Sequence, residues 1–118
     1  MAKRILSVCY DAVLLNTRRM LLEHEGYVVT SALGFTEAIS RCMEGGFDLF
    51  ILCHSLPDKN KEQLIKMFRS GCSAPVLSLR KTGERIVTAA DYQVFSHKPD
   101  ELLNAIARIF SRRVSAPG

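Results

Sequence analysis

The sequence lacks the features that would place it in several specialised classes of protein. No apolar run approaches the length of a membrane-spanning helix, and the first residues, MAKRILSV, do not have the anatomy of a signal peptide. The four cysteines form no CxxC pair and no metal-ligand spacing. We therefore expect a cytoplasmic protein with reduced thiols and with no resident metal or other cofactor.

Positive charge is present but modest, with a formal net charge of +4. The basic residues gather near the two ends of the chain, at Lys3, Arg4, Arg18 and Arg19 and at Arg108, Arg112 and Arg113. A nucleic-acid-binding domain usually carries a denser basic patch together with a known motif. Binding to nucleic acid is therefore not expected, and a solvated basic face is the simpler interpretation.

The composition is that of an ordinary globular domain. The chain has 118 residues, of which 47% are hydrophobic and 24% are charged. This length supports one domain with a proper core that needs no disulfide or metal. We expect that domain to span residues 1–113 and the remaining residues, 114–118, to form a flexible tail.

Short apolar segments alternate along the chain with longer amphipathic ones. The strands predicted from this pattern cover residues 4–9, 27–32, 48–53, 74–79 and 92–96. Helical periodicity falls on residues 11–26, 35–46, 61–71 and 100–113, whereas residues 80–91 allow only a shortened fourth helix. This order predicts an α/β, flavodoxin-like, doubly wound fold with a five-stranded parallel sheet in the order 2-1-3-4-5 and helices on both faces.

Asp11 and Asp100 are the predicted N-caps of the first and last helices. The residues predicted to face inward are Val13, Leu14, Thr17, Met20 and Leu21 in the first helix, Ala38, Ile39, Cys42 and Met43 in the second, Leu64, Met67 and Phe68 in the third, and Leu102, Leu103, Ile106, Ile109 and Phe110 in the last.

In this strand order the functional crevice lies beyond the carboxyl ends of the first and third strands. Cys9 and Cys53 end those two strands. No glycine-rich loop follows the first strand, which argues against binding of dinucleotides and against a P-loop.

Several segments resemble the receiver domain of response regulators. ILSVCYDAVLLNTRRMLLEHEGYVV is similar to that family's first strand, first helix and second strand, and GGFDLFILCHSLPD is similar to its third strand and the loop that follows. APVLSL resembles the fourth strand, and AADYQVFSHKPDELLNAIARI resembles the fifth strand and the last helix. The resemblance covers nearly the whole chain and implies the receiver fold.

The same resemblance implies that the family's phosphorylation residues are missing. The family uses an acidic pair to hold Mg²⁺, an aspartate as the phosphoacceptor, a Thr or Ser after the fourth strand, and a Lys-Pro pair after the fifth. The matching positions here are Cys9 and Tyr10 for the acidic pair, Cys53 for the acceptor, Arg80 for the hydroxyl, and Phe95 and Ser96 for the Lys-Pro pair. We therefore expect no phosphorylation at Cys53 and no enzymatic activity, and we regard a Mg²⁺ site as doubtful.

Three charged residues could still take part in the crevice. Asp11 is an acidic residue beside the missing pair, and Arg80 could form a salt bridge with it, turn to solvent, or bind an anion from a partner. Lys98 stands before Pro99, three residues past the expected Lys-Pro position, and could reach the crevice if the loop were shifted.

Cys53 itself allows three interpretations. A free cysteine is among the most often buried residue types, so Cys53 and Cys9 could be small core residues. Alternatively, Cys53 could be a reactive thiol whose pKa is lowered by Arg80 or His54, with Cys9 within disulfide range. A soft-metal site formed by Cys9, Cys53 and His54 is the third interpretation.

From these residues we expect a degenerate receiver-like signalling domain that acts through protein contacts, with a kinase, a regulator or an effector domain as partner. A homodimer through the face of the fifth strand and the last helix is also possible, and a short fourth helix could expose apolar surface around Ile86, Val87 and Tyr92. The alternative function is a cysteine-based redox switch on the same fold. The sequence leaves open whether the chain is a whole protein or a piece of a larger regulator.

Overall fold

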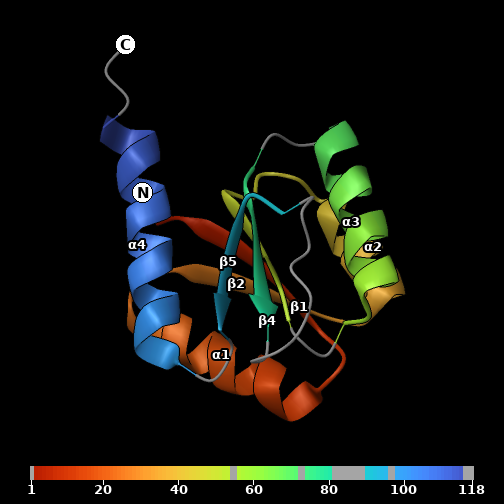
Figure 1. Ribbon diagram of the computed structural model, residues 1–118, viewed down its shortest axis with the longest axis horizontal. Helices are drawn as coiled ribbons and strands as arrows, with labels where there is room; N and C mark the ends of the chain where they lie inside the picture. The colour runs from red at the N-terminus through yellow and green to blue at the C-terminus, as the bar shows by residue number, and fades with distance from the viewer. Residues whose placement is uncertain (1, 54–55, 72–73, 81–89, 96–97, 116–118) are drawn as a thin grey trace.

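A computed structural model describes residues 2–53, 56–71, 74–80, 90–95 and 98–115 (Figure 1). The strands are β1 (Arg4–Cys9), β2 (Val28–Leu33), β3 (Leu49–Leu52), β4 (Val76–Arg80) and β5 (Tyr92–Phe95), and the helices are α1 (Ala12–His24), α2 (Phe35–Cys42), α3 (Asp58–Gly71) and α4 (Pro99–Ser115). All strand pairs are parallel, and their order is β2-β1-β3-β4-β5. The predicted fold class and strand order are therefore confirmed.

The sheet lies between two helical layers, with α1 and α4 on one face and α2 and α3 on the other (Figure 1). The α2–α3 side is filled by a cluster of buried residues that includes Phe50 and Phe68, whose rings stack with centroids 4.0 Å apart. The α1–α4 side is filled by a second cluster that includes Leu22, Leu77 and Ile106. All four residues of β3 are buried because both faces of this central strand are covered.

Two aspartates fasten the amino ends of the strands, at the edge of the sheet opposite the predicted crevice. Asp48, just before β3, accepts a hydrogen bond from the backbone N–H of Arg4 at 2.8 Å. Asp91, just before β5, accepts one from the N–H of Val76 at 2.8 Å and also pairs with Arg69 of α3 at 3.0 Å. These two hydrogen bonds help to fix the register of β1 with β3 and of β4 with β5, and therefore where the carboxyl ends of these strands lie.

Helix α1 begins as predicted but turns a different face to the core. The Asp11 side chain accepts hydrogen bonds from the N–H groups of Val13 and Leu14, so Asp11 is the N-cap. The predicted inward stripe included Val13 and Met20, yet these residues are exposed, and the buried positions are Leu15, Arg18 and Leu22. The prediction was wrong because the helix is rotated by about one residue relative to the apolar pattern.

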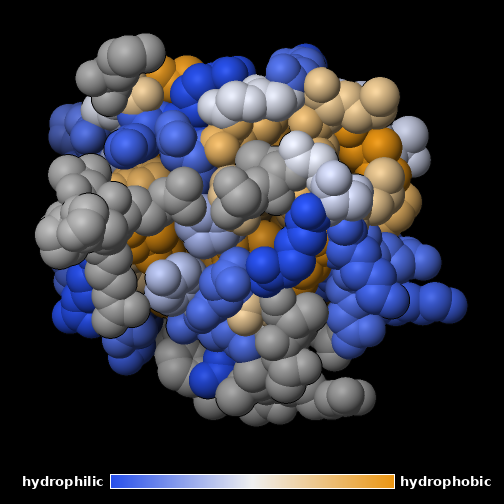
Figure 2. Space-filling view, turned by 90° about the horizontal axis from the view of Figure 1, so that it is seen from above, coloured by the Kyte–Doolittle hydropathy of each residue, from blue (hydrophilic) through white to orange (hydrophobic). Residues whose placement is uncertain are grey.

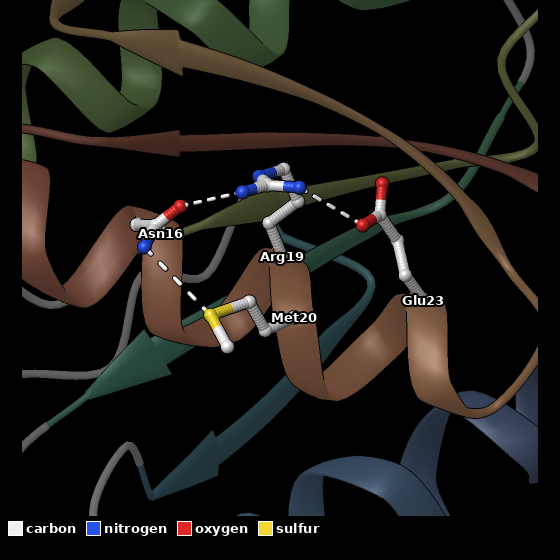
Figure 3. A network of polar contacts seen from close by, with 4 residues as sticks. All are labelled: Asn16, Arg19, Met20 and Glu23. Carbon is white, nitrogen blue, oxygen red and sulfur yellow. Dashed lines mark hydrogen bonds and ion pairs between the residues drawn. The ribbon is translucent and has the colours of Figure 1, made fainter.

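The outer face of α1 carries a polar network instead (Figure 3). The Arg19 guanidinium donates to the Asn16 side-chain oxygen at 2.7 Å and to the Glu23 carboxylate at 2.9 Å. The Asn16 side-chain amide in turn donates to the sulfur of Met20 at 3.8 Å. Met20 therefore lies among solvated polar groups rather than in the core.

Helix α3 also differs from its prediction. It begins at Asp58, three residues before the predicted start, so Lys61 lies inside the helix. Its buried residues are Lys61, Leu64, Ile65 and Phe68, whereas Met67, which was predicted to face inward, is exposed. In α2, Ala38 is buried as predicted, but Met43, which was also predicted to face inward, is 83% exposed.

The inward stripe of α4 is confirmed: Leu102, Ile106, Ile109 and Phe110 are buried, and Leu103 packs against them. Asp100, predicted as the N-cap, lies within the first turn of α4. The helix continues to Ser115, past residue 113, where the predicted domain ends. The short fourth helix was predicted within residues 80–91, and most of that segment, residues 81–89 with Ile86 and Val87, lies outside the described residues.

The surface of the molecule mixes polar and apolar side chains. Figure 2 shows polar and charged residues around smaller hydrophobic areas on the face seen from above. Within the described ranges, no helix combines the length and the apolar character that crossing a membrane requires.

The orientation of α1 can be tested by two substitutions on the same helix. Leu22 is fully buried and Met20 is 60% exposed. We expect Leu22→Ala to lower the free energy of unfolding by about 2–5 kcal/mol, because it leaves a cavity. Met20→Ala should change it by no more than about 0.5 kcal/mol, because this side chain is solvated. Urea denaturation measures both values, and equal losses would contradict the orientation described here.

Candidate functional site

The carboxyl ends of β1 and β3 meet as the sequence predicts, and their terminal cysteines are buried. Cys9 is 0% exposed and Cys53 is 1% exposed. The N–H of Cys53 donates to the carbonyl oxygen of Val8 at 2.9 Å, which continues the β1–β3 register. Cys9 and Cys53 pack with Leu15, and with the partly buried Leu14, in a small cluster that we call the crevice cluster. The predicted contact of the two strand ends is confirmed.

A buried arginine from α1 points into this cluster. Arg18 is 6% exposed, and its Nη1 donates to the Sγ of Cys53 at 2.9 Å. Within the described part of the chain, this is the only hydrogen bond or ion pair of the Arg18 side chain. A permanent positive charge therefore lies beside the thiol at the carboxyl end of β3.

A second buried cation comes from α3. Lys61 is 0% exposed, and its Nζ donates to the Oγ of Ser78 at 3.1 Å and to the carbonyl oxygen of Leu79 at 2.9 Å. Both acceptors lie near the carboxyl end of β4, next to β3 in the sheet. Arg18 and Lys61 thus approach the carboxyl ends of the central strands from opposite faces of the sheet.

Tyr10, the residue after β1, contacts both α3 and the start of α2. Its hydroxyl accepts a hydrogen bond from the side-chain amide of Asn60 at 2.7 Å, which links the β1–α1 connection to α3. Its ring packs on Gly34, where an added Cβ would lie 2.9 Å from Tyr10 Cε1. Gly34 also has φ +88°, so its conformation and the close approach of the ring both favour glycine.

The predicted salt bridge between Asp11 and Arg80 is wrong. The Asp11 carboxylate is exposed and is used to cap α1, and within the described residues it makes no ion pair. Arg80 ends β4 and lines a groove of about 520 Å³ that β5 and α4 also border. The other residues of this groove include Tyr92, Gln93, Asn104 and Arg108.

Lys98 does not extend into the crevice either. Its ammonium group lies 3.5 Å from the Glu101 carboxylate, and about half of each side chain is exposed. The prediction that a shifted loop could bring Lys98 into the crevice, in place of the family's lysine, is therefore wrong. Phe95 ends β5 opposite Arg80, but its side chain, together with Ser96 and His54, lies outside the described residues.

The described residues include no group of three or more His, Cys, Asp or Glu side chains that could hold a metal ion. The soft-metal interpretation needs His54 as its third ligand, and His54 lies outside the described part of the chain. The pKa of Tyr27 is raised above 10.0 by burial and by the nearby Glu25, but Tyr27 lies at the amino end of β2, away from the crevice.

Sequence reasoning missed Arg18 and Lys61 as crevice residues. Both occupy positions where helical spacing places a core residue: Arg18 lies three residues after Leu15 and four before Leu22, and Lys61 lies three before Leu64. A charged residue inside an apolar stripe is a signal of a buried cation. This signal was missed because the predicted buried face of α1 was the wrong one, and because α3 begins three residues earlier than predicted.

Comparisons with known proteins agree with this fold. No family model matches the chain. The transcriptional regulatory protein ResD of Bacillus subtilis is 26% identical, over 92% of this chain and 48% of its own length. The chain therefore spans about half the length of this curated relative.

Solved receiver structures superpose on nearly the whole chain. A two-component response regulator from Clostridium difficile has a TM-score of 0.81 and 23% identity, and the match covers 97% of this chain and 99% of the other. The response regulator TrrA of Thermotoga maritima, solved with Mg²⁺-BeF, has a TM-score of 0.75 and 26% identity over 91% and 98% of the two chains. The complex of the histidine kinase ThkA with TrrA has a TM-score of 0.74 and 25% identity, and the match covers 91% of this chain and 97% of the other. In fold and in sequence, this chain is therefore similar to the receiver domains of two-component response regulators.

Proposed function

We propose that this domain signals through contacts with other proteins and does not take up a phosphoryl group at the end of β3. The observation that carries the proposal is the content of the crevice: two buried thiols, with the guanidinium of Arg18 bonded to one of them. The Asp11 carboxylate next to the crevice is engaged as a helix cap.

The charges in the crevice oppose Mg²⁺. A magnesium ion needs hard oxygen ligands, usually one or two carboxylates. Cys9 supplies a thiol and Tyr10 a phenol already bonded to Asn60. A dication about 6 Å from one guanidinium would be repelled by roughly 5 kcal/mol at an effective dielectric near 20. Arg18 and Lys61 therefore disfavour the metal on which the family's chemistry depends.

The acceptor position supports the same proposal. Receiver phosphorylation forms an acyl phosphate, for which the nucleophile must be a carboxylate. Cys53 has none, and its sulfur is already in contact with Arg18. Retaining a cluster of carboxylates without a metal would also be costly, since two like charges about 4 Å apart repel by roughly 4 kcal/mol.

The partner that we propose is another protein, such as a histidine kinase, a regulator or an effector domain. The complex of ThkA with TrrA shows that one receiver of this fold binds a kinase. On this chain we propose the groove between β5 and α4 as part of the contact face, including contact with a second copy. Its residues combine the aromatic Tyr92 with exposed polar groups on α4, such as Asn104 and Arg108.

The second candidate function is a thiol-based redox switch. Arg18 favours it, because a neighbouring arginine stabilises a thiolate. The two buried cysteines packed in one cluster also favour it. Both candidates are compatible with the loss of phosphorylation.

The loss of phosphorylation can be tested with a small phosphodonor and Mg²⁺. We expect intact-mass spectrometry of this chain to show no added phosphoryl group, and fluorine NMR with beryllofluoride to show no bound signal. TrrA, treated in parallel, is the positive control. Cys53→Asp alone should also remain unmodified, because it restores the acceptor but not the metal site. Phosphoryl transfer to the unaltered chain would refute the proposal.

The contact face can be tested by charge reversal on α4. Arg108 is exposed and lines the groove, so Arg108→Glu should leave the unfolding midpoint unchanged. If the groove forms a homodimer, this variant should weaken self-association at least tenfold in analytical ultracentrifugation. Arg19→Glu, on the outer face of α1, is the matched control and should associate like the unaltered chain. Equal association of all three proteins would place self-association elsewhere.

A further inference from the structure

We propose that Arg18 holds Cys53 as a thiolate at neutral pH, and that this buried ion pair, with Cys9 beside it, is a site of reversible oxidation by a small peroxide. This inference deepens the second candidate function and rests on it. It is independent of whether the domain can be phosphorylated.

Arg18 is a buried positive charge that needs a compensating partner. A guanidinium cannot lose its proton in a protein, and Arg18 is 6% exposed. Burying a charge is costly unless an opposite charge or strong hydrogen bonds compensate it. Within the described residues, the only acceptor that Arg18 finds is the sulfur of Cys53. A thiolate would neutralise the guanidinium, whereas a thiol is only a weak acceptor.

The direction of the contact also favours a thiolate. Arg18 Nη1 donates to Cys53 Sγ at 2.9 Å. Hydrogen bonds between ionised partners are roughly twice as strong as those between neutral ones. A guanidinium directed at the sulfur therefore stabilises the thiolate more than the thiol.

The other charged or titratable groups around Cys53 favour the same ionisation state. Lys61 adds a second buried positive charge from α3, at the carboxyl end of the adjacent strand β4, and Cys9 of β1 contributes a second thiol. The Tyr10 phenol is bonded to Asn60. Asp11, at the amino end of α1, is exposed and accepts hydrogen bonds from the first turn of that helix. Among the described residues, positive charge therefore dominates around the sulfur.

Cys9 is placed to complete the reaction. Val8 and Leu52 are partners in the parallel ladder, so Cys9 and Cys53 follow as the next pair along the two strands. Neighbouring strands lie about 4.8 Å apart, which is within the range of about 4.4–6.8 Å between Cα atoms that a disulfide spans. Both side chains belong to the crevice cluster on the α1 side of the sheet.

The chemistry balances with hydrogen peroxide as the named oxidant. The Cys53 thiolate attacks one peroxide oxygen, the O–O bond breaks, and the departing hydroxide takes a proton to become water. The Cys9 sulfur then attacks the resulting sulfenic acid and the S–O bond breaks. The hydroxyl leaves with the proton of Cys9 as a second water. The protein loses two hydrogens, and the peroxide is reduced.

Access to the sulfur depends on local opening of the structure. Cys53 is 1% exposed, so peroxide can reach the sulfur only when the carboxyl end of β3 opens transiently.

The test uses the full chain with Cys42 and Cys72 replaced by Ser, so that only the two crevice thiols remain. Ultraviolet absorbance of the thiolate should titrate well below the value of about 8.5 for a free thiol. Peroxide should remove two hydrogens in intact-mass spectrometry, and a reductant should restore them. With Cys9→Ser, the reaction should stop at the addition of one oxygen.

Arg18→Met is the decisive variant, and Arg19→Met, on the solvated face of the same helix, is its matched control. Arg18→Met should slow oxidation at least tenfold, because a shift of one pKa unit changes the thiolate fraction about tenfold. Arg19→Met should react like the parent chain. If Arg18→Met fails to fold, Arg18→Lys retains the positive charge and should keep the low titration midpoint.

Two results would overturn the inference: a Cys53 titration at or above the free-thiol value, or an oxidation rate that does not depend on the charge at residue 18. The second result would leave a redox role for Cys53 possible while removing Arg18 from it. Neither result bears on phosphorylation, which the phosphodonor experiment decides separately.

Discussion

The buried positive charge of Arg18 is the constraint on which the arrangement of the crevice depends. A guanidinium that is 6% exposed must have an acceptor, and the acceptor is the sulfur at the end of β3. An aspartate at that position would pair with the same arginine and would be less available as a nucleophile. Under the proposed loss of phosphorylation, Cys9, Tyr10 and Cys53 share the crevice with a cation that the resemblance to the receiver family did not predict.

The framework that positions this crevice is the ordinary one for its fold. Parallel strands bring the ends of β1 and β3 together, and the helical layers cover both faces of β3. Asp48 and Asp91 fasten the opposite edge of the sheet. The fold thus fixes where the ends of β1 and β3 meet but not which chemical groups stand there, so fold similarity alone does not decide function.

Much of the fold could be predicted from the sequence because the strands are apolar and well separated. The strand order, the Asp11 cap and the inward stripe of α4 are confirmed. The faces of α1 and α3 were harder to predict, because Met20 and Met67 count as apolar yet lie at the surface. Their thioethers are flexible and weakly polar, so exposure costs them little.

Only part of the candidate site could be predicted from the sequence. The positions of Cys9 and Cys53 follow from strand order alone. The pairing of Arg18 with Cys53 does not follow from strand order, because it depends on the rotation of α1 about its own axis. If the buried face of α1 is shifted by one residue, Arg18 moves from the core to the solvent. The expected pairing of Arg80 with Asp11 failed for a local reason: the amino end of α1 provides that carboxylate with two backbone donors.

We propose that the cations and thiols at the carboxyl ends of β1 and β3 exclude Mg²⁺ from this crevice. Isothermal titration calorimetry of the unaltered chain with MgCl₂ measures this most directly, with TrrA titrated in parallel and with Arg18→Met as the charge-removed variant. The account predicts no saturable binding of Mg²⁺ to the unaltered chain at millimolar concentrations. Saturable binding of Mg²⁺ to the unaltered chain, perturbing the backbone amides of Cys9 and Cys53 in NMR spectra, would contradict it.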